Sequence, residues 1–319
     1  MTSSEHWIFV SLVAARTFQF VATAIACGGT LFIIAVLEPA LNRSGTTIPA
    51  YPKLRRQLSL LIWVALAVLF LSALWWLVLQ SADMSGAPVS EVASGGILWT
   101  VLTQTGFGNA WSVRLVLMLL LMLTWTRPTI PMSSWSGATR VALALSVAGA
   151  LAWSGHAHAG SGLQRASHLA IDALHLIAAA AWLGALLPLA FVLRHSAMHA
   201  FSFKAVRYVV FRFSTLGIAA VAALVLSGIV NALMIIEEPR ALFESTYGRI
   251  LLLKVGLFLI MLAVAAFNRR RLTPQLANSN DAPHAVRALA RNCLIEAALG
   301  GIILALVGAL GIVSPGNEG

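Results

Sequence analysis

The sequence predicts an all-α integral membrane protein built as a bundle of eight transmembrane helices. Of its 319 residues, 59% are hydrophobic and only 10% are charged, whereas soluble chains carry roughly 25% charged residues. The apolar residues also gather into long stretches separated by short polar connections. A water-soluble fold of this composition would lack the polar side chains needed to cover its surface, so the lipid bilayer is the expected surrounding.

Eight apolar stretches approach the length of about 20 residues that a membrane-spanning helix requires. The third and fourth are short, and Gly96–Thr105 is predicted to form an additional interfacial or re-entrant helix before the third. The predicted spans are Trp7–Leu37, Leu58–Gln80, Ala110–Trp125, Thr139–Trp153, Ser167–Leu193, Phe213–Ile236, Gly248–Phe267 and Leu289–Val313.

The distribution of Lys and Arg predicts the orientation of the bundle. The chain has 21 basic and 11 acidic residues. In a soluble protein this excess would suggest nucleic acid as a partner, but here it marks cytoplasmic connections. Connections after even-numbered spans carry only Arg165, Arg240 and Arg249. We therefore expect both termini on the outer side. Connections after odd-numbered spans carry Arg43, Lys53, Arg55, Arg56, Arg127, Arg140, Arg194, Lys204, Arg207, Arg212, Arg269, Arg270, Arg271, Arg287 and Arg291.

Short matches between the two halves of the sequence suggest an internal duplication. Each half has a polar residue nine positions before a glycine in its first span, and an aromatic-Gly pair six positions before a basic residue in its third. A four-helix unit repeated in the same orientation would give these matches, with units at residues 1–160 and 161–319. The alternative is coincidence in an apolar background. The matched pairs are Arg16 with Asp172, Gln19 with His175, Gly28 with Gly184, Thr105 with Thr246, Gly108 with Gly248, and Arg114 with Lys254.

Five charged residues lie more than three residues from either end of a predicted span, where a charge costs several kcal/mol unless it is paired or hydrated. They are Arg16, Arg114, Asp172, Lys254 and Glu296, and all but Glu296 fall in the outer half. One interpretation is structural, with Asp172 paired to Arg16 or Lys254 across helices. The other is a polar cavity that opens outward and binds or passes an ion.

Four histidines and one carboxylate are predicted to converge at the outer boundary. His156 and His158 lie in a Gly-rich connection just after the fourth span, and His168, Asp172 and His175 follow on one face of the fifth. Imidazole with carboxylate suits zinc, copper, iron or nickel, and Asp172 would act as a ligand or orient a histidine. The alternative is that these histidines are packing residues.

Other motifs add little chemistry. Met84 and Met234 lie near the outer ends of their helices and are candidate soft ligands for Cu(I), although packing is the usual role of a membrane methionine. We find no phosphate-binding loop, nucleophile elbow or His-Glu-x-x-His motif. The sequence therefore predicts neither ATP-driven pumping nor hydrolysis, and no enzyme.

Several short motifs, in order, resemble the copper resistance protein D (CopD) family of bacterial inner-membrane proteins. The resemblance covers most of the chain and is best over residues 204–313. In the C-terminal half it rests on Ser227-Gly-Ile-Val-Asn231-Ala, Thr246-Tyr-Gly248, Lys254, Asn268-Arg269, Glu296 and Pro315. In the N-terminal half it rests on Phe107-Gly108, Trp111, Arg114, Gly155-His156-Ala157, His175 and Trp182-Leu-Gly184.

The resemblance implies a multi-pass protein of the bacterial inner membrane with periplasmic termini that handles copper, Cu(I) or Cu(II), usually by uptake. It also implies a separate periplasmic copper-binding partner of the CopC-like type. The ligand set comes from the residue spacing and is not carried over from the family.

We therefore expect copper transport, with the histidines and Asp172 capturing the ion on the outer side. Asn231, Lys254, Arg16 and Glu296 would line or brace the route inward, and Arg114 would serve as a structural or pathway charge. Two alternatives stay open. One is a b-type cytochrome, although its paired haem histidines should lie on facing helices. The other is a metal-binding sensor or assembly factor that transports nothing.

Overall fold

Eight long helices form the whole scaffold of the protein. A computed structural model of the chain describes residues 3–44, 51–126, 135–154, 162–198, 203–235 and 240–313, and all regular structure within these residues is helical. The prediction of an all-α protein with eight membrane-length helices is confirmed. These segments are His6–Ser44, Tyr51–Ser85, Gly106–Trp125, Trp135–Trp153, Gly162–Ala197, Phe203–Met234, Thr246–Gln275 and Ala282–Leu310.

The first segment is part of a continuous helix from Ser3 to Ser44 that contains two π-helical turns, η1 and η2. The other three of the first four segments are α-helical, except for a short 3-10 turn at the end of the fourth. The elements are α1 Ser3–Thr23, η1 Ala24–Gly28, α2 Gly29–Leu31, η2 Phe32–Leu37, α3 Glu38–Ser44, α4 Tyr51–Ser85, α5 Val89–Val92, α6 Gly96–Gln104, α7 Gly106–Trp125, α8 Trp135–Gly149 and η3 Ala150–Ser154.

The last four segments contain the longest α-helix of the described residues, α9 with 37 residues, and a third π-turn. Pro188 lies inside α9. The elements are α9 Gly162–Met198, α10 Phe203–Ile235, α11 Ala241–Glu244, α12 Thr246–Phe267, η5 Asn268–Leu272, α13 Thr273–Gln275 and α14 Ala282–Leu310.

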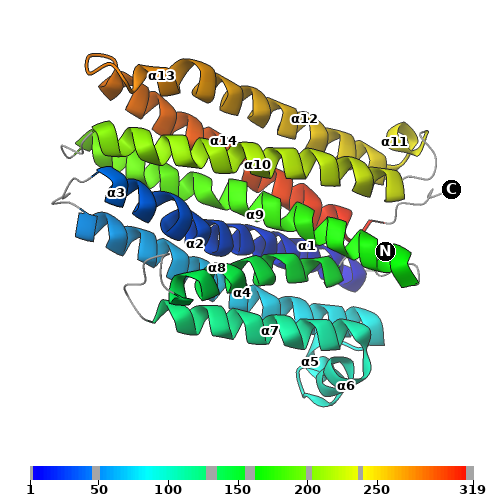
Figure 1. The fold of residues 1–319 in the computed structure, drawn as a ribbon. Helices are drawn as coiled ribbons and strands as arrows, with labels where there is room; N and C mark the ends of the chain where they lie inside the picture. The colour runs from blue at the N-terminus through cyan, green and yellow to red at the C-terminus, as the bar shows by residue number, and fades with distance from the viewer. Residues whose placement is uncertain are drawn as a thin grey trace.

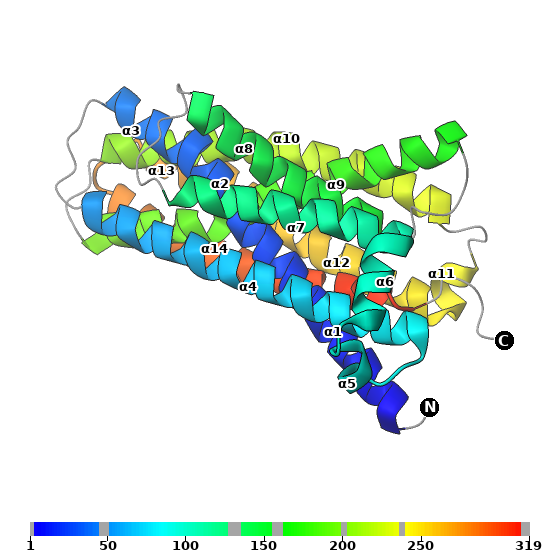
Figure 2. The ribbon, with the colours of Figure 1, turned by 90° about the horizontal axis from the view of Figure 1, so that it is seen from below.

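The long helices run side by side, and α1 begins at the same end of the bundle where α14 ends (Figures 1 and 2). We call this the terminal end. It also holds the start of α9, the end of α10 and the start of α12 (Figure 1). The other end, where α3 ends and α4 begins, is the opposite end. An even number of spans places the start of α1 and the end of α14 together at the terminal end; that the terminal end is the outer side stays a prediction.

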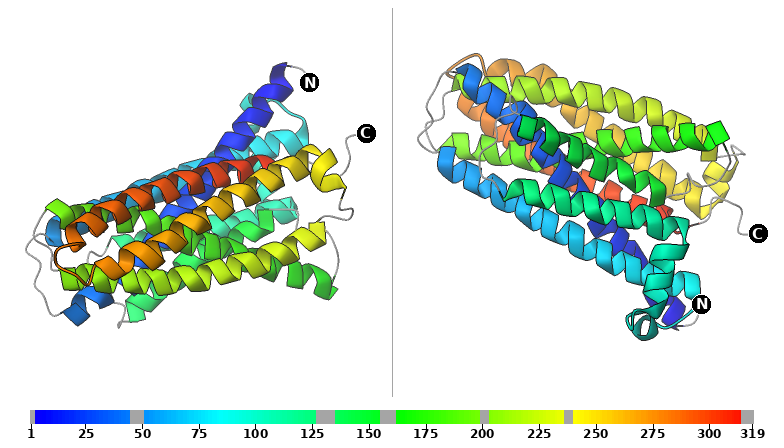
Figure 3. Two further views of the ribbon diagram at one scale, coloured as in Figure 1. Left: turned by 90° about the horizontal axis from the view of Figure 1, so that it is seen from above. Right: turned by 60° about the horizontal axis from the view of Figure 1, so that its bottom comes forward.

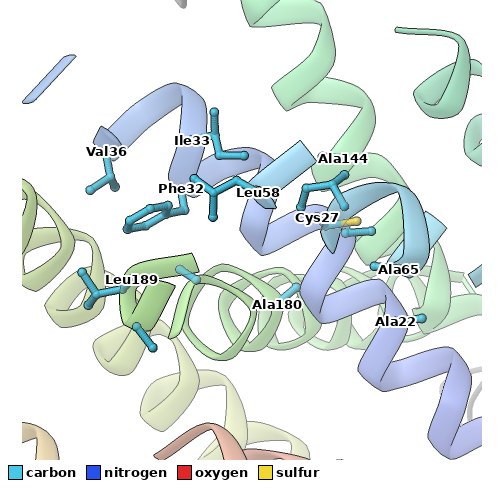
Figure 4. Packing of buried hydrophobic residues seen from close by; sticks show 14 of the residues in the cluster. Ala22, Cys27, Phe32, Ile33, Val36, Leu58, Ala65, Ala144, Ala180 and Leu189 are labelled. Atoms are coloured by element: carbon cyan, nitrogen blue, oxygen red, sulfur yellow. The ribbon is translucent and has the colours of Figure 1, made fainter. Parts of the chain in front are cut away.

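The centre of the bundle is the crossing of η1 with α9. A Cβ added to Gly28 would lie 1.9 Å from the Ala180 carbonyl oxygen, and one added to Gly184 would lie 1.7 Å from the Ala24 carbonyl oxygen. Each helix thus presents a small residue and a glycine four positions apart, the spacing that lets membrane helices touch backbone to backbone. Buried side chains such as Cys27, Phe32 and Leu189 fill the surrounding core (Figure 4).

The predicted extra helix at Gly96–Thr105 exists as α6, and it folds back beside the start of α7 at the terminal end (Figure 3). The Thr105 hydroxyl oxygen accepts a hydrogen bond from the Gly108 N–H at 2.9 Å and so caps α7. A Cβ on Gly108 would lie 2.0 Å from the Val101 carbonyl oxygen. Gly108 therefore permits the tight turn between α6 and α7.

The outer faces of the bundle are apolar, as contact with lipid requires. Leu120 and Leu123 on α7, Leu226 on α10 and Leu259 on α12 are exposed. The basic η5 lies at the opposite end, and so does the Arg55 side chain, whose Nη2 lies 3.6 Å from Glu38 Oε1.

Candidate metal site

The terminal part of α9 presents a polar face toward α10. His168, Asp172 and His175 are spaced four and three residues apart, so they share one side of the helix. All three are partly buried. His156 and His158, the other two predicted ligands, lie outside the described residues.

Ser227 on α10 holds the ring of His175. The His175 Nδ1 and Ser227 Oγ atoms lie 2.9 Å apart, while Ser227 Oγ donates to the Ala223 carbonyl oxygen at 2.5 Å. A hydroxyl has one proton to donate, so the arrangement favours an Nδ1–H that donates to Ser227 Oγ. The lone pair on Nε2 is then left for a metal ion. This is how an outer partner fixes the tautomer of a histidine ligand.

Asn231 contacts Asp172 one turn further along α10. Asn231 Nδ2 donates to Asp172 Oδ1 at 3.2 Å. The Asn231 Oδ1 atom is buried and has no hydrogen-bond partner among the described residues. An unpaired buried oxygen is rare and calls for an explanation such as an absent ion or water. The same amide group contacts Asp172, whose carboxylate would attract a cation.

The third wall of the site comes from the start of α12. The Ser245 hydroxyl oxygen accepts from the Gly248 N–H at 2.9 Å, so Ser245 caps this helix. Asp172 interacts electrostatically with His168, Lys254 and Tyr247. No Lys254 nitrogen comes within 4.0 Å of the carboxylate in the described structure. Lys254 is thus a nearby charge, not a direct ion-pair partner.

The described residues do not close a complete metal site. They contain no group of three or more His, Cys, Asp or Glu side chains close enough together to hold one ion. The predicted soft ligands Met84 and Met234 lie near the terminal ends of α4 and α10, with exposed fractions of 49% and 37%. His168, Asp172 and His175 are therefore not gathered closely enough to hold one ion together, and the other predicted ligands, His156 and His158, lie beyond the described residues.

The structure places the basic residues Arg16 and Arg114 in the N-terminal half, away from Asp172. The Arg16 guanidinium lies 4.6 Å from the ring centre of Trp76, and Arg114 Nη2 donates to Thr23 Oγ1 at 3.0 Å. Both side chains are almost fully buried. The predicted Arg16–Asp172 pair is not found among the described residues.

The N-terminal half carries contacts at the positions that match the polar face of α9. Ser72 on α4 donates to Gln19 Oε1 at 2.6 Å, where the other half joins Ser227 to His175. Arg16 stacks on Trp76, four residues after Ser72. In the other half Asp172 meets a residue four after Ser227. The same pairs of positions meet, and both halves use a serine, but the other side chains differ.

Glu296 lies apart from the histidines, toward the opposite end. Its Oε1 accepts from Asn268 Nδ2 at 2.7 Å, and the carboxylate is buried between α12 and α14. A buried apolar cluster that includes Trp182, Leu224 and Met261 occupies the bundle between these two polar regions. The structure is therefore closed between the predicted capture site and the predicted inner residue.

Sequence reasoning missed the role of Ser227 as the partner of His175. The signal is present, because Ser227 and Asn231 are spaced four residues apart on a helix antiparallel to α9. Between antiparallel helices, the later residue Asn231 contacts the earlier Asp172, and Ser227 contacts His175. Helix α12 begins at Thr246, two residues before the predicted span start at Gly248, and its capping side chain is Ser245, not the Thr246 that the predicted repeat matches with Thr105.

Comparison with known proteins identifies relatives along the whole chain. The family description "Copper resistance protein D-like, N-terminal domain" matches residues 4–167, and "Copper resistance protein D" matches residues 207–310. The Copper resistance protein D of Pseudomonas syringae pv. tomato is 32% identical over 96% of this chain and 97% of its own length. No solved structure matches.

Two further relatives come from different bacteria. Inner membrane protein YebZ of Escherichia coli is 31% identical over 76% of this chain and 83% of its own length. Copper transport protein CutJ of Bacillus subtilis is 28% identical over 64% of this chain and 38% of its own length. With eight membrane-length helices, the chain is a multi-pass inner-membrane protein, and it belongs to the copper resistance protein D family.

Proposed function

We propose that this protein carries copper ions across the inner membrane, from the periplasm toward the cytoplasm. Relatives named for copper resistance and copper transport support the cargo. The observation that carries the proposal is the fixed ring of His175, whose Nδ1 is engaged by Ser227 so that Nε2 is left for a metal. The protein acts as a carrier and not as an enzyme.

The terminal end of the bundle is the proposed capture side. Copper binds to His175 and His168, with His156 and His158 from the adjoining connection, and Asp172 serves as ligand or orienter. Imidazole nitrogen is a good ligand for copper in either oxidation state that the cell presents. The unpaired Asn231 Oδ1 lies next to this site and would take part in passing the ion inward.

The basic connections support a cytoplasmic location for the opposite end. We accordingly place both termini and the histidines in or facing the periplasm. A separate periplasmic copper-binding protein of the CopC-like type would deliver the ion there. The exposed terminal-end residues Trp7, Trp75 and Trp99 suit the membrane–water boundary on that side.

We also propose that residues 1–160 and 161–319 form two four-helix units in a parallel repeat. The reciprocal contact of Gly28 with Gly184 supports this relation. So do the matched caps, Thr105 on Gly108 and Ser245 on Gly248, with the same 2.9 Å hydrogen bond. In this arrangement the C-terminal unit, joined by the connection with His156 and His158, supplies the copper site.

Copper flux into proteoliposomes tests the proposed function. Wild-type protein should move copper into the vesicles, and a His156→Ala/His158→Ala/His175→Ala variant should not. The matched control is His284→Ala, an exposed histidine at the opposite end of the bundle. Equal flux through wild type and the triple variant would remove these histidines from the pathway. Copper binding without any flux would favour a sensor or assembly factor, and a haem absorption spectrum would favour a cytochrome.

A further inference from the structure

Glu296 is a buried carboxylate in the middle of a membrane-spanning helix. It follows Ala282, the first residue of α14, by 14 positions and precedes Leu310, the last, by the same number. Its side chain is 2% exposed. No Lys, Arg or His nitrogen of the described residues lies within 4.0 Å of it, whereas Glu38 has Arg55 at 3.6 Å.

Two buried amide side chains form a chain of hydrogen bonds that ends on this carboxylate. Asn292 Nδ2 donates to Asn268 Oδ1 at 2.6 Å, and Asn268 Nδ2 donates to Glu296 Oε1 at 2.7 Å. Asn268 is also the first residue of the π-turn η5, and π-turns inside helices frequently occur at functional sites. The amides supply hydrogen bonds to Glu296 but no charge.

The charged groups of α14 and of the elements packed against it lie elsewhere or are exposed. α14 packs against α1, α9, α12, η5 and α13. The exposed charged side chains are Arg270 and Arg271 on η5 and Arg287 and Arg291 on α14. Arg16 on α1 lies against Gly311, and Arg269 of η5 donates to Ser214 on α10.

On α9, Leu183 contacts Gly300. Because α9 runs antiparallel to α14, the level of Glu296 lies about four residues after Leu183, and Arg194 and His195 lie about two turns beyond that level. On α12, Lys254 lies about 21 Å from Asn268 along the helix. The titratable group that does interact with Glu296 is the uncharged thiol of Cys293.

An ionised carboxylate in this setting would be strongly unfavourable, and a bound proton removes the charge without needing any space. We propose that Glu296 is a proton-binding site whose release and uptake of one proton couples copper movement to proton counter-movement. The O–H bond of the acid breaks to give Glu296 carboxylate and a free proton, and the reverse step resets the site. This coupling rests on the proposed copper transport.

The helix that carries Lys254 also provides the mechanical link. Residues Thr246–Gln275 form one continuous helical rod. A shift of this rod when copper binds near Asp172 would move Asn268 and change its hydrogen bond to Glu296. The copper site and the proton site then communicate across the apolar cluster that separates them.

Infrared spectroscopy tests the protonation directly and needs no copper. Wild-type protein at neutral pH should show the carbonyl stretch of a buried protonated carboxylic acid, and the isosteric Glu296→Gln variant should lack it. The matched control is Glu91→Gln, which changes an exposed glutamate and should keep the band. Absence of a band that depends on Glu296 overturns the proposal.

Proteoliposomes with an imposed pH gradient test the coupling. A gradient that is acidic inside should accelerate copper uptake by wild type, and vesicles holding a pH-sensitive dye should report proton exit. Glu296→Gln should bind copper normally but lose the dependence on the gradient. A gradient effect that is absent in wild type, or equal in both proteins, overturns the coupling. Complete absence of copper flux in wild type would instead contradict the proposed function, and the infrared result would still decide whether Glu296 holds a proton.

Discussion

The two halves of this protein place matching residues in contact but give them different chemistry. In the N-terminal half Gln19 bonds Ser72 at 2.6 Å, and in the C-terminal half His175 bonds Ser227 at 2.9 Å. One turn away, Arg16 stacks on an aromatic ring in the first half. At the corresponding place the second half has the carboxylate Asp172.

The difference separates residues that stabilise the helix bundle from residues that could bind a metal ion. In the first half arginine carries a positive charge that repels a cation, and glutamine and tryptophan carry no charge. Histidine, aspartate and asparagine give the second half lone pairs and a negative charge. A serine on the next helix supports the central residue in both halves, so support alone does not create a metal site.

Replacing His175 by glutamine, the residue at the corresponding position 19, should have the largest effect on copper affinity. His175→Gln keeps a side chain that can bond Ser227 but removes the imidazole, and we expect copper affinity to fall by more than about 100-fold. Equilibrium copper binding by purified protein measures this. The control is Gln19→Leu, which should leave copper affinity unchanged. Unchanged copper affinity in His175→Gln would show that the imidazole of His175 is not what distinguishes the second half from the first.

Removing the supporting serine should have unequal consequences in the two halves. Ser227→Ala frees the ring of His175, and loss of such an outer partner typically weakens metal binding about 10–100-fold. Ser72→Ala should cost only about 1 kcal/mol of stability, as one lost hydrogen bond does, with copper binding intact. Copper titration and thermal unfolding in detergent distinguish the two. Equal copper affinities would contradict the role of Ser227.

Substitution of either glycine at the crossing of η1 and α9 should lower the stability of the protein by a similar amount. Gly28→Val and Gly184→Val each force a side chain against the partner backbone, and overpacking of this kind costs about 1–3 kcal/mol. Thermal unfolding of the two variants should show similar destabilisation. Gly256→Val, which adds a side chain where nothing lies within 4 Å, is the matched control. A large effect at only one crossing glycine would break the proposed symmetry.

The smallest expected effect concerns the basic residues on α7 and α12. Lys254→Met removes a positive charge that interacts with Asp172, so copper should bind a few-fold more tightly. Arg114→Met should leave copper affinity unchanged, because Arg114 bonds Thr23 in the other half. The comparison is made by copper titration at low salt. Weaker binding in Lys254→Met would assign Lys254 a supporting role instead.

Hydropathy was sufficient to predict the eight helices because each span needs a long apolar stretch in lipid. Each predicted span stops short of the observed helix at one end or at both ends. Helix α10 begins at Phe203, and the prediction began ten residues later, because the basic residues Arg207 and Arg212 lower the hydropathy there. The π-turns at Ala24–Gly28 and Asn268–Leu272 have no local sequence signal. They arise from how helices pack, which a single sequence does not display.

The candidate site was predictable only where it depends on one helix. The shared face of Asp172 and His175 follows from their spacing on α9. The contacts of Ser227 with His175 and of Asn268 with Glu296 depend on the register between helices. That register is set by the packing of α10 on α9 and of α12 and η5 on α14 along the length of the bundle. Sequence spacing therefore gave the candidate ligands and not the residues that hold them.

The proposed copper site is built from imidazoles and includes His168 and His175 on α9 at the terminal end of the bundle. X-ray absorption spectroscopy of the purified, copper-loaded protein reports the ligands of the metal. We expect copper coordinated by several imidazole nitrogens in wild type, with fewer in His175→Gln and no change in His284→Ala. Copper coordinated without imidazole, or an identical spectrum in wild type and His175→Gln, would contradict the proposed site.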